Sequence, residues 1–129
     1  MKQKLVDYPI HLGLGAKASV EPLFSGIEWY SAYEERHSGD GSEGRLVSIY
    51  TFDKHWDSWE MHPYGSEVVF CIQGDITLIQ EVEGKHQHII LQTGEYIINP
   101  PGIWHTADVS NRATVLFITA GKGTEQKKR

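Results

Sequence analysis

The sequence predicts an all-β protein built as an antiparallel sandwich or barrel. Short runs rich in β-branched and aromatic residues recur between Arg45 and Ala120, with Gly, Pro or Asn turns between them and no long helical pattern. Several runs, such as Val68–Ile72, are apolar on both faces, whereas a half-exposed sheet would carry polar residues on one face. We therefore expect one face to line an enclosed cavity and the other to pack on a second layer or on a partner subunit.

Composition limits the classes of protein to consider. A length of 129 residues suits one domain, 1–129, with a single hydrophobic core. The formal net charge of −5 and the lack of a basic stripe argue against nucleic-acid binding. No apolar run is long enough to span a membrane, and no apolar segment follows the N-terminal lysines as in a signal peptide. Cys71 is the only cysteine, so no intrachain disulfide forms, and we expect a cytoplasmic protein.

Residues 1–44 are expected to form an N-terminal extension. Gly13-Leu14-Gly15 is interpreted as a loop, because the later glycines or lysine of a nucleotide-binding loop do not follow it. Ser25–Glu28 has the spacing of a helix capping box, and the aromatic residues after it recur near helical spacing. This predicts a short helix over about 26–36, with an edge strand as the alternative.

The barrel core is predicted over about 45–120. The expected strands are Arg45–Phe52, Glu60–His62, Glu67–Gln73, Asp75–Val82, His86–Gln92, Tyr96–Asn99, Trp104–Val109 and Ala113–Ala120. Residues 121–129 form a charged tail that we expect to be frayed and solvated.

The stretch from Trp59 to Gly74 holds the main candidate site. Glu60 and His62 are two positions apart, so on a strand both side chains project from one face, about 7 Å apart. A turn at Pro63-Tyr64-Gly65 then precedes Glu67, which opens the next apolar run. Carboxylates and imidazoles are the ligands that zinc, iron, manganese and nickel accept, so the pattern predicts a metal site.

These residues resemble the first motif of the cupin family. That motif has two histidines two positions apart, followed by a glutamate and a glycine. His62, Glu67 and Gly74 match it, Glu60 stands in place of the first histidine, and Lys54 replaces the leading glycine.

A second cupin motif follows in register and in the expected order. Gly94, Pro100, Gly102 and His105 match it, while Val109 stands where the motif has an asparagine. The resemblance covers roughly residues 45–120. It implies a small double-stranded β-helix, a jelly-roll barrel, with one divalent transition metal (Fe, Mn, Ni or Zn) held by His62, Glu67, His105 and Glu60.

The role of Glu60 is open between two alternatives. As a fourth ligand, it would place two carboxylates on the divalent ion and weaken the attraction for anionic substrates. Off the metal, it would be a candidate general base beside an activated water or substrate. The ligand role is slightly favoured.

The resemblance implies an enzyme that acts on a small organic molecule in the barrel cavity, of the dioxygenase, isomerase or lyase type. The alternative is a non-catalytic barrel that binds or senses a small molecule. A homodimer is expected from the resemblance and from the apolar outer faces. The residues predicted to line the substrate pocket are Tyr64, Phe52 and Phe70.

Other candidate residues receive structural interpretations. His86 and His88 have ligand spacing, but they follow a hairpin turn, so we expect them on the surface with His55. Strand alternation directs Trp59, Met61 and Trp104 away from the metal. Asp108 falls on the face opposite His105 and receives no catalytic role. His11 and His37 belong to no recognisable group of ligands.

Overall fold

The computed structural model describes residues 1–129, and its regular elements are ten strands, one α-helix and two short 3-10 turns joined by loops. The strands are β1 (Ile10–Gly13), β2 (Lys17–Val20), β3 (Arg45–Phe52), β4 (Ser58–Met61), β5 (Glu67–Val82), β6 (Lys85–Gln92), β7 (Tyr96–Asn99), β8 (His105–Asp108), β9 (Ala113–Thr119) and β10 (Glu125–Lys128). The helix α1 spans Ile27–Arg36, and the 3-10 turns are η1 (Leu14–Ala16) and η2 (Ser38–Asp40). The all-β prediction is confirmed. No helix is long and apolar enough to cross a membrane.

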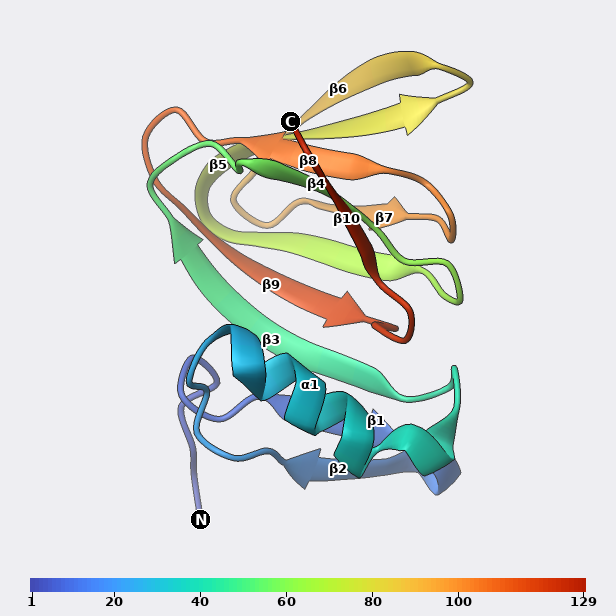
Figure 1. Ribbon diagram of the computed structural model, residues 1–129. Coiled ribbons are helices and arrows are strands. Elements are labelled where there is room, and N and C mark those ends of the chain that lie inside the picture. Colours follow the sequence, from blue (N-terminus) through green and yellow to red (C-terminus); the bar gives the residue numbers. More distant parts are fainter.

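Two antiparallel layers face each other across the core (Figure 1). One layer runs β7, the first half of β5, β9, β3, β1 and β2, and the other runs β6, the second half of β5, β8, β4 and β10. The core between them contains Val69, Cys71, Ile76, Leu78, Leu91, Ala107, Val109, Ala113, Val115 and Phe117. Alternate residues of β5 and β9 are therefore buried, as the apolar patterns predict.

β5 is one continuous strand, where two strands were predicted. Its pairing with β9 shifts register between Cys71 and Gln73, which is a β-bulge, and the strand continues through Gly74 into the second layer. Gly74 has φ +85°, and a Cβ there would lie 2.2 Å from the Arg112 carbonyl oxygen. Only glycine allows this close approach, so the residue interpreted as a break is the point where the strand bends.

The N-terminal extension is more regular than predicted. The Gly13-Leu14-Gly15 segment joins β1 to β2 in a hairpin, and β1 pairs with β3 and so widens the first layer. The helix is confirmed within one residue of its predicted start. The capping box is wrong, because Gly26 at the N-cap has φ +111° and no side chain caps the helix. Trp29 and Tyr33 of α1 pack on Leu46 of β3 instead.

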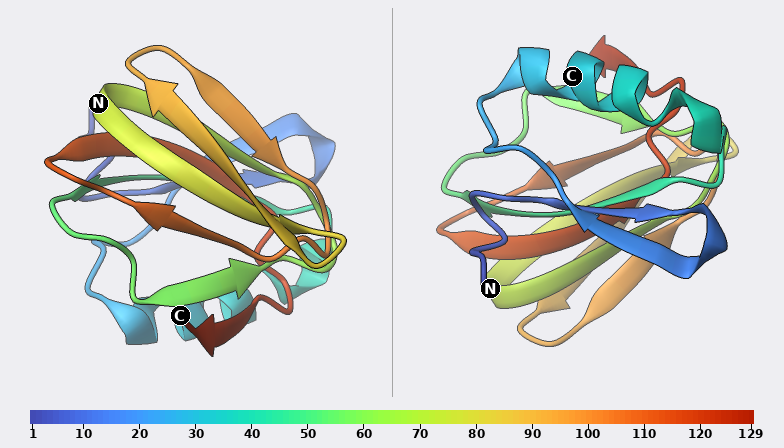
Figure 2. Two further views of the ribbon diagram at one scale, coloured as in Figure 1. Left: turned by 90° about the horizontal axis from the view of Figure 1, so that it is seen from above. Right: turned by 90° about the horizontal axis from the view of Figure 1, so that it is seen from below.

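The C-terminal segment is an ordered strand, and the prediction of a frayed tail is wrong. β10 pairs with β4 along Glu125–Lys128, opposite Met61–Ser58. Arg129 donates to the carbonyl oxygens of Trp56 and Ala107 at 2.9 and 3.0 Å and to Asp108 Oδ1 at 2.6 Å. The backbone ladder and this arginine hold a strand whose side chains are all exposed. β10 and α1 lie on the same side of the molecule in both views of Figure 2.

Candidate metal centre

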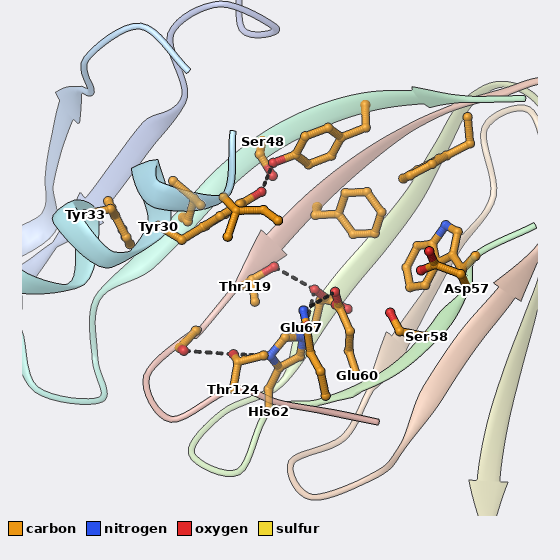
Figure 3. Close-up of a pocket in the computed structure, with 18 of the residues that line it drawn as sticks. Tyr30, Tyr33, Ser48, Asp57, Ser58, Glu60, His62, Glu67, Thr119 and Thr124 are labelled. Carbon is orange, nitrogen blue, oxygen red and sulfur yellow. Dashed lines mark hydrogen bonds and ion pairs between the residues drawn. The ribbon is translucent and has the colours of Figure 1, made fainter. Parts of the chain in front are cut away.

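The structure brings together the four side chains predicted from the two motifs, Glu60, His62, Glu67 and His105. Figure 3 shows three of them, Glu60, His62 and Glu67. Glu60 of β4 is the register partner of His105 of β8, while His62 follows β4 and Glu67 begins β5. The connecting turn is tight, because a Cβ on Gly65 would lie 2.5 Å from that of Ala120. This turn sets Glu67 against the end of β4.

Glu67 contacts both histidine rings and is held by two neutral donors. Its Oε2 lies 3.2 Å from His62 Nε2, and its Oε1 lies 3.2 Å from His105 Nε2. Asn99 Nδ2 donates to Oε1 at 3.1 Å, and Thr119 Oγ1 donates to Oε2 at 2.7 Å. The carboxylate therefore has a fixed orientation while each oxygen keeps a lone pair for a further partner.

The hydrogen bonds at Nδ1 determine the tautomers of both histidines. Thr124 Oγ1 donates to the Gly121 carbonyl, so it accepts the Nδ1–H of His62 at 2.8 Å. His105 Nδ1 donates to the Ile103 carbonyl at 3.3 Å. In the neutral rings both Nε2 atoms then carry lone pairs, and both are buried without a hydrogen-bond partner.

This arrangement fits a metal ion. Two lone pairs facing a carboxylate repel it unless a cation or a proton lies between them. Ligand atoms about 2.1 Å from one ion lie roughly 3.0–3.4 Å apart at ordinary coordination angles. Each 3.2 Å contact has this spacing, one to Oε2 of Glu67 and one to Oε1, so an ion between the two imidazoles would face both carboxylate oxygens. One potential ligand atom from each of Glu60, His62 and His105 also lies within 4.8 Å of the others, so the group can hold a metal.

The charges in the site shift three pKa values. Burial raises the pKa of Glu67, but contact with His105 and His62 outweighs burial and holds it well below its usual range. Burial lowers the pKa of His105, but Glu67 and then Glu60 raise it by more. Burial and the Glu67 charge raise the pKa of Glu60, which accepts one weak bond from Gln126 Nε2 at 3.4 Å.

A cavity of about 770 Å³ opens beside these residues. Its walls come from α1, β3, β9, β4 and β10, and Glu60, His62 and Glu67 all line it. Phe52 also lines it, as predicted, but Tyr64 and Phe70 do not. Tyr64 is 60% exposed on the outer side of its turn, and Phe70 lies on β5 opposite Leu116 and Tyr96.

The remaining predicted surface residues lie away from the cluster. Trp59 contacts His86 and Lys127 on the outer face of its sheet, with ring centroids of Trp59 and His86 4.9 Å apart. His55 accepts the amide of Val109 at 2.8 Å, and its ring lies on the exposed cavity rim. Asp108 pairs with Arg129.

Several residues around the site carry no sequence signal. Thr124 and Gln126 belong to the segment predicted to fray, yet both touch predicted ligands. Tyr30 of α1 lines the cavity and bonds the hydroxyl of Tyr50. The helix predicted from its capping spacing and aromatic periodicity gives no reason to expect the hydrogen bond between Tyr30 and Tyr50.

His11 and His37 form a second group with Asp40, contrary to the sequence interpretation. His11 Nε2 lies 2.6 Å from Asp40 Oδ2, and His11 Nδ1 lies 2.6 Å from the Tyr33 hydroxyl. The two imidazoles stack with centroids 3.6 Å apart, and His37 Nε2 bonds Glu21 at 3.0 Å. The members come from β1, from the residue that follows α1 and from η2, so their sequence positions gave no hint of the contact.

Comparison with known proteins assigns the family. A family model described as a cupin domain matches residues 48–120. The chain belongs to the cupin family. Comparison with curated protein sequences gives no significant match.

Solved structures agree with this cupin in fold. A cupin-2 domain protein from Shewanella frigidimarina has a TM-score of 0.51 at 20% identity, over 58% of this chain and 69% of its own. An Fe(II) enzyme named HppE, solved with an alternative substrate, has a TM-score of 0.51 at 14% identity. The match covers 58% of this chain and 42% of HppE. Hydroquinone 1,2-dioxygenase from Sphingomonas, solved with 4-hydroxybenzoate bound, has a TM-score of 0.50 at 16% identity. The match covers 58% of this chain and 59% of the dioxygenase chain. This cupin spans less than two thirds of both enzymes, and identities this low establish the fold alone.

Proposed function

We propose that this cupin is a metal-dependent enzyme that acts on a small organic molecule in the cavity. The observation that carries the proposal is the pair of buried Nε2 atoms, on His62 and His105, that face Glu67 without hydrogen-bond partners. Glu67, His62 and His105 are the proposed ligands of one divalent transition metal, with Glu60 as a fourth. The set of two imidazoles and a carboxylate suits Fe, Mn, Ni or Zn.

The metal supplies Lewis-acid polarisation of a substrate oxygen when it is bound. Thr124 and the Ile103 carbonyl keep the two imidazoles in the tautomer that presents Nε2 to the ion. Asn99 and Thr119 fix the carboxylate of Glu67. Gln80 in turn donates to Asn99 Oδ1 at 2.8 Å, so the support extends into the second layer of the barrel.

If Glu60 is not a ligand, it would instead act as the general base of the site. Its pKa is raised by burial and by the charge of Glu67, which brings it nearer to neutral pH. It also lines the cavity and makes only the weak contact with Gln126. A carboxylate that is half-buried, loosely held and next to bound substrate can take a proton from carbon or oxygen, as an isomerase or lyase requires.

Metal analysis tests the proposal. Protein purified without chelator should contain about one equivalent of metal, and His62→Ala and His105→Ala should lose it, while His86→Ala keeps it as the matched surface control. A screen of small organic molecules with the metal-loaded protein then tests for turnover. Stoichiometric metal with ligand binding but no turnover would instead indicate a binding or sensing barrel. Metal-free protein of unchanged stability in both variants would contradict the metal site.

We also propose that this cupin forms a homodimer in the cytoplasm. Ile72 of β5 and Tyr96 and Ile98 of β7 are exposed on the outer face of the first layer, which gives this layer an apolar outer surface. Analytical ultracentrifugation should give twice the chain mass, and Ile98→Lys should shift it to the monomer. A monomeric wild-type protein at micromolar concentration would contradict this.

A further inference from the structure

The charged groups that line the cavity are mainly acidic. Glu60 and Glu67 lie at the metal centre, and Glu34, Asp53 and Asp57 line the cavity further out. Lys54 is the single lysine or arginine among the lining residues. The nearby arginines are engaged elsewhere, since Arg36 pairs with Glu21 and Arg129 with Asp108.

A bound metal does not reverse this balance. The two carboxylates of Glu60 and Glu67 neutralise a divalent ion, and the remaining acids leave the cavity negative. An anionic ligand would therefore lose its hydration while Lys54 is the single cationic side chain among the lining residues and five carboxylates oppose it. An uncharged ligand has no such cost.

One wall of the cavity is aromatic. Phe52, Trp56 and Phe117 pack against one another, with ring centroids 5.5 Å apart for Phe52 and Trp56 and 6.1 Å apart for the other two pairs. Tyr50 continues the wall, 5.9 Å from Phe117, and Trp56 extends it to within 6.4 Å of the His105 ring. Partly exposed rings in this arrangement offer a surface on which a planar apolar molecule can pack next to the metal centre.

A group of hydroxyls lies across the cavity from the metal centre. Tyr30 of α1 and Tyr50 of β3 share a hydrogen bond beside Ser48, and Figure 3 shows Tyr30 and Ser48 on one side of the cavity with Glu60, Glu67 and His62 on the other. Burial raises the pKa of both tyrosines, so their hydroxyls stay protonated. A bonded pair of hydroxyls uses one proton internally and keeps one to donate to a ligand oxygen.

We propose that the cavity takes an uncharged aromatic molecule with a hydroxyl or carbonyl group and discriminates against its carboxylate counterpart. The aromatic wall receives the ring, the Tyr30–Tyr50 pair donates to an oxygen, and the acidic lining repels anions. This assignment rests on the proposed metal-dependent function, because it places the ring next to the metal centre.

The test compares two ligands of nearly equal shape, 4-hydroxybenzamide and 4-hydroxybenzoate, by titration calorimetry with zinc-loaded protein at low ionic strength. The amide should bind at least about tenfold more tightly, since the acids that face the cavity act only on the anion. Equal binding, tighter binding of the benzoate, or no binding of either ligand would overturn the proposal. Zinc content measured on the same samples separates these outcomes from failure of the metal site.

Substitutions of the acidic lining and of Tyr30, each with a control variant, test which residues cause the preference for the amide. Asp53→Asn with Asp57→Asn should raise benzoate affinity about threefold or more and leave amide affinity unchanged, whereas Asp75→Asn, outside the cavity, should change neither. Tyr30→Phe should weaken amide binding about two- to tenfold, the ordinary contribution of one hydrogen bond. Tyr96→Phe, on the outer surface, is its matched control. An unchanged benzoate affinity in the Asp double variant, or an unchanged amide affinity in Tyr30→Phe, would contradict the assigned roles.

Discussion

Two groups of histidines and carboxylates lie in this cupin, and they differ in how their nitrogens are satisfied. Around Glu67, two Nε2 atoms approach the carboxylate at 3.2 Å and make no hydrogen bond. Around His11, both ring nitrogens form 2.6 Å contacts, with Asp40 and with the Tyr33 hydroxyl. The first group has lone pairs left over, and the second has none on His11.

The geometry of the rings adds to this difference. His62 and His105 are tilted by 40° with centroids 5.2 Å apart, so their in-plane lone pairs can converge. His11 and His37 stack nearly parallel at 14°, which directs their lone pairs side by side. Closeness of ligand-type residues therefore does not identify a metal site. Buried lone pairs without a partner, converging on one point, are the better criterion.

The largest effect expected is on metal content, and it separates the two groups directly. His105→Ala should remove stoichiometric metal, because it deletes a converging lone pair in a site with no replacement ligand. His11→Ala should retain the full metal content, since its nitrogens are already bonded. Elemental analysis of both variants provides the comparison, and metal loss in His11→Ala would break it.

The pH dependence of metal binding should be the next largest effect. The pKa of His105 is raised by Glu67 and Glu60, so a proton competes with the metal over a wider range than for an ordinary histidine. Affinity should fall about tenfold for each unit below that pKa, or roughly a hundredfold over two units. Competition with a chelator across pH measures this, and a flat profile would contradict it.

The raised pKa of His105 also affects the stability of the metal-free protein, and there low pH is favourable rather than unfavourable. A raised pKa means that the folded state holds the proton more tightly, so His105 stabilises the metal-free fold at low pH. This stabilisation is lost as pH rises through the raised pKa. Denaturation of metal-free protein should show that trend, and His105→Ala should lack it.

Substitution in the second group, His11, His37 and Asp40, should lower the stability of the fold. His11→Ala leaves Asp40 and Tyr33 without their shared partner and should lower the free energy of unfolding by about 2 kcal/mol. Urea denaturation measures this loss, with the exposed His88→Ala as the control. A stability equal to the wild type would show that the hydrogen bonds of this group contribute nothing.

The smallest effect should come from the support of His62. Thr124→Val removes the acceptor for the Nδ1–H of His62 while keeping the side-chain shape, so metal affinity should fall about tenfold. Thr124→Ser should restore it, because the hydroxyl returns. Thr114→Val, whose hydroxyl bonds only Thr51 on the exposed surface, is the control. Equal metal affinity in Thr124→Val and the wild type would exclude a supporting role.

The sequence predicted the parts of this molecule that rest on local pattern. Two-sided apolar runs gave the strands of the core, and motif spacing brought Glu60, His62, Glu67 and His105 into one expected group. The turn after His62 is a short-range feature, whereas His105 joins the group through the long-range β4–β8 pairing, and only the resemblance to the second cupin motif predicted that part.

The features that the sequence did not predict depend on contacts between residues far apart in the chain, which leave no local sequence pattern. β10 has no apolar residue to mark it, and its ladder with β4 is recognised only in three dimensions. Thr124 and Gln126 thus escaped notice, as did the contact of His11 with Asp40 across the N-terminal extension. Gly74 was interpreted as a break because sequence does not distinguish a turn glycine from one that admits a close carbonyl.

The position of β10 has a consequence for how fast the metal enters and leaves. This strand is at the edge of its layer and pairs only with β4, and Thr124, whose hydroxyl holds His62, directly precedes it. Edge strands with exposed side chains open at low cost, well below that of global unfolding. Metal dissociation and hydrogen–deuterium exchange of the β10 amides should therefore share one opening event and slow down together when that strand is tethered.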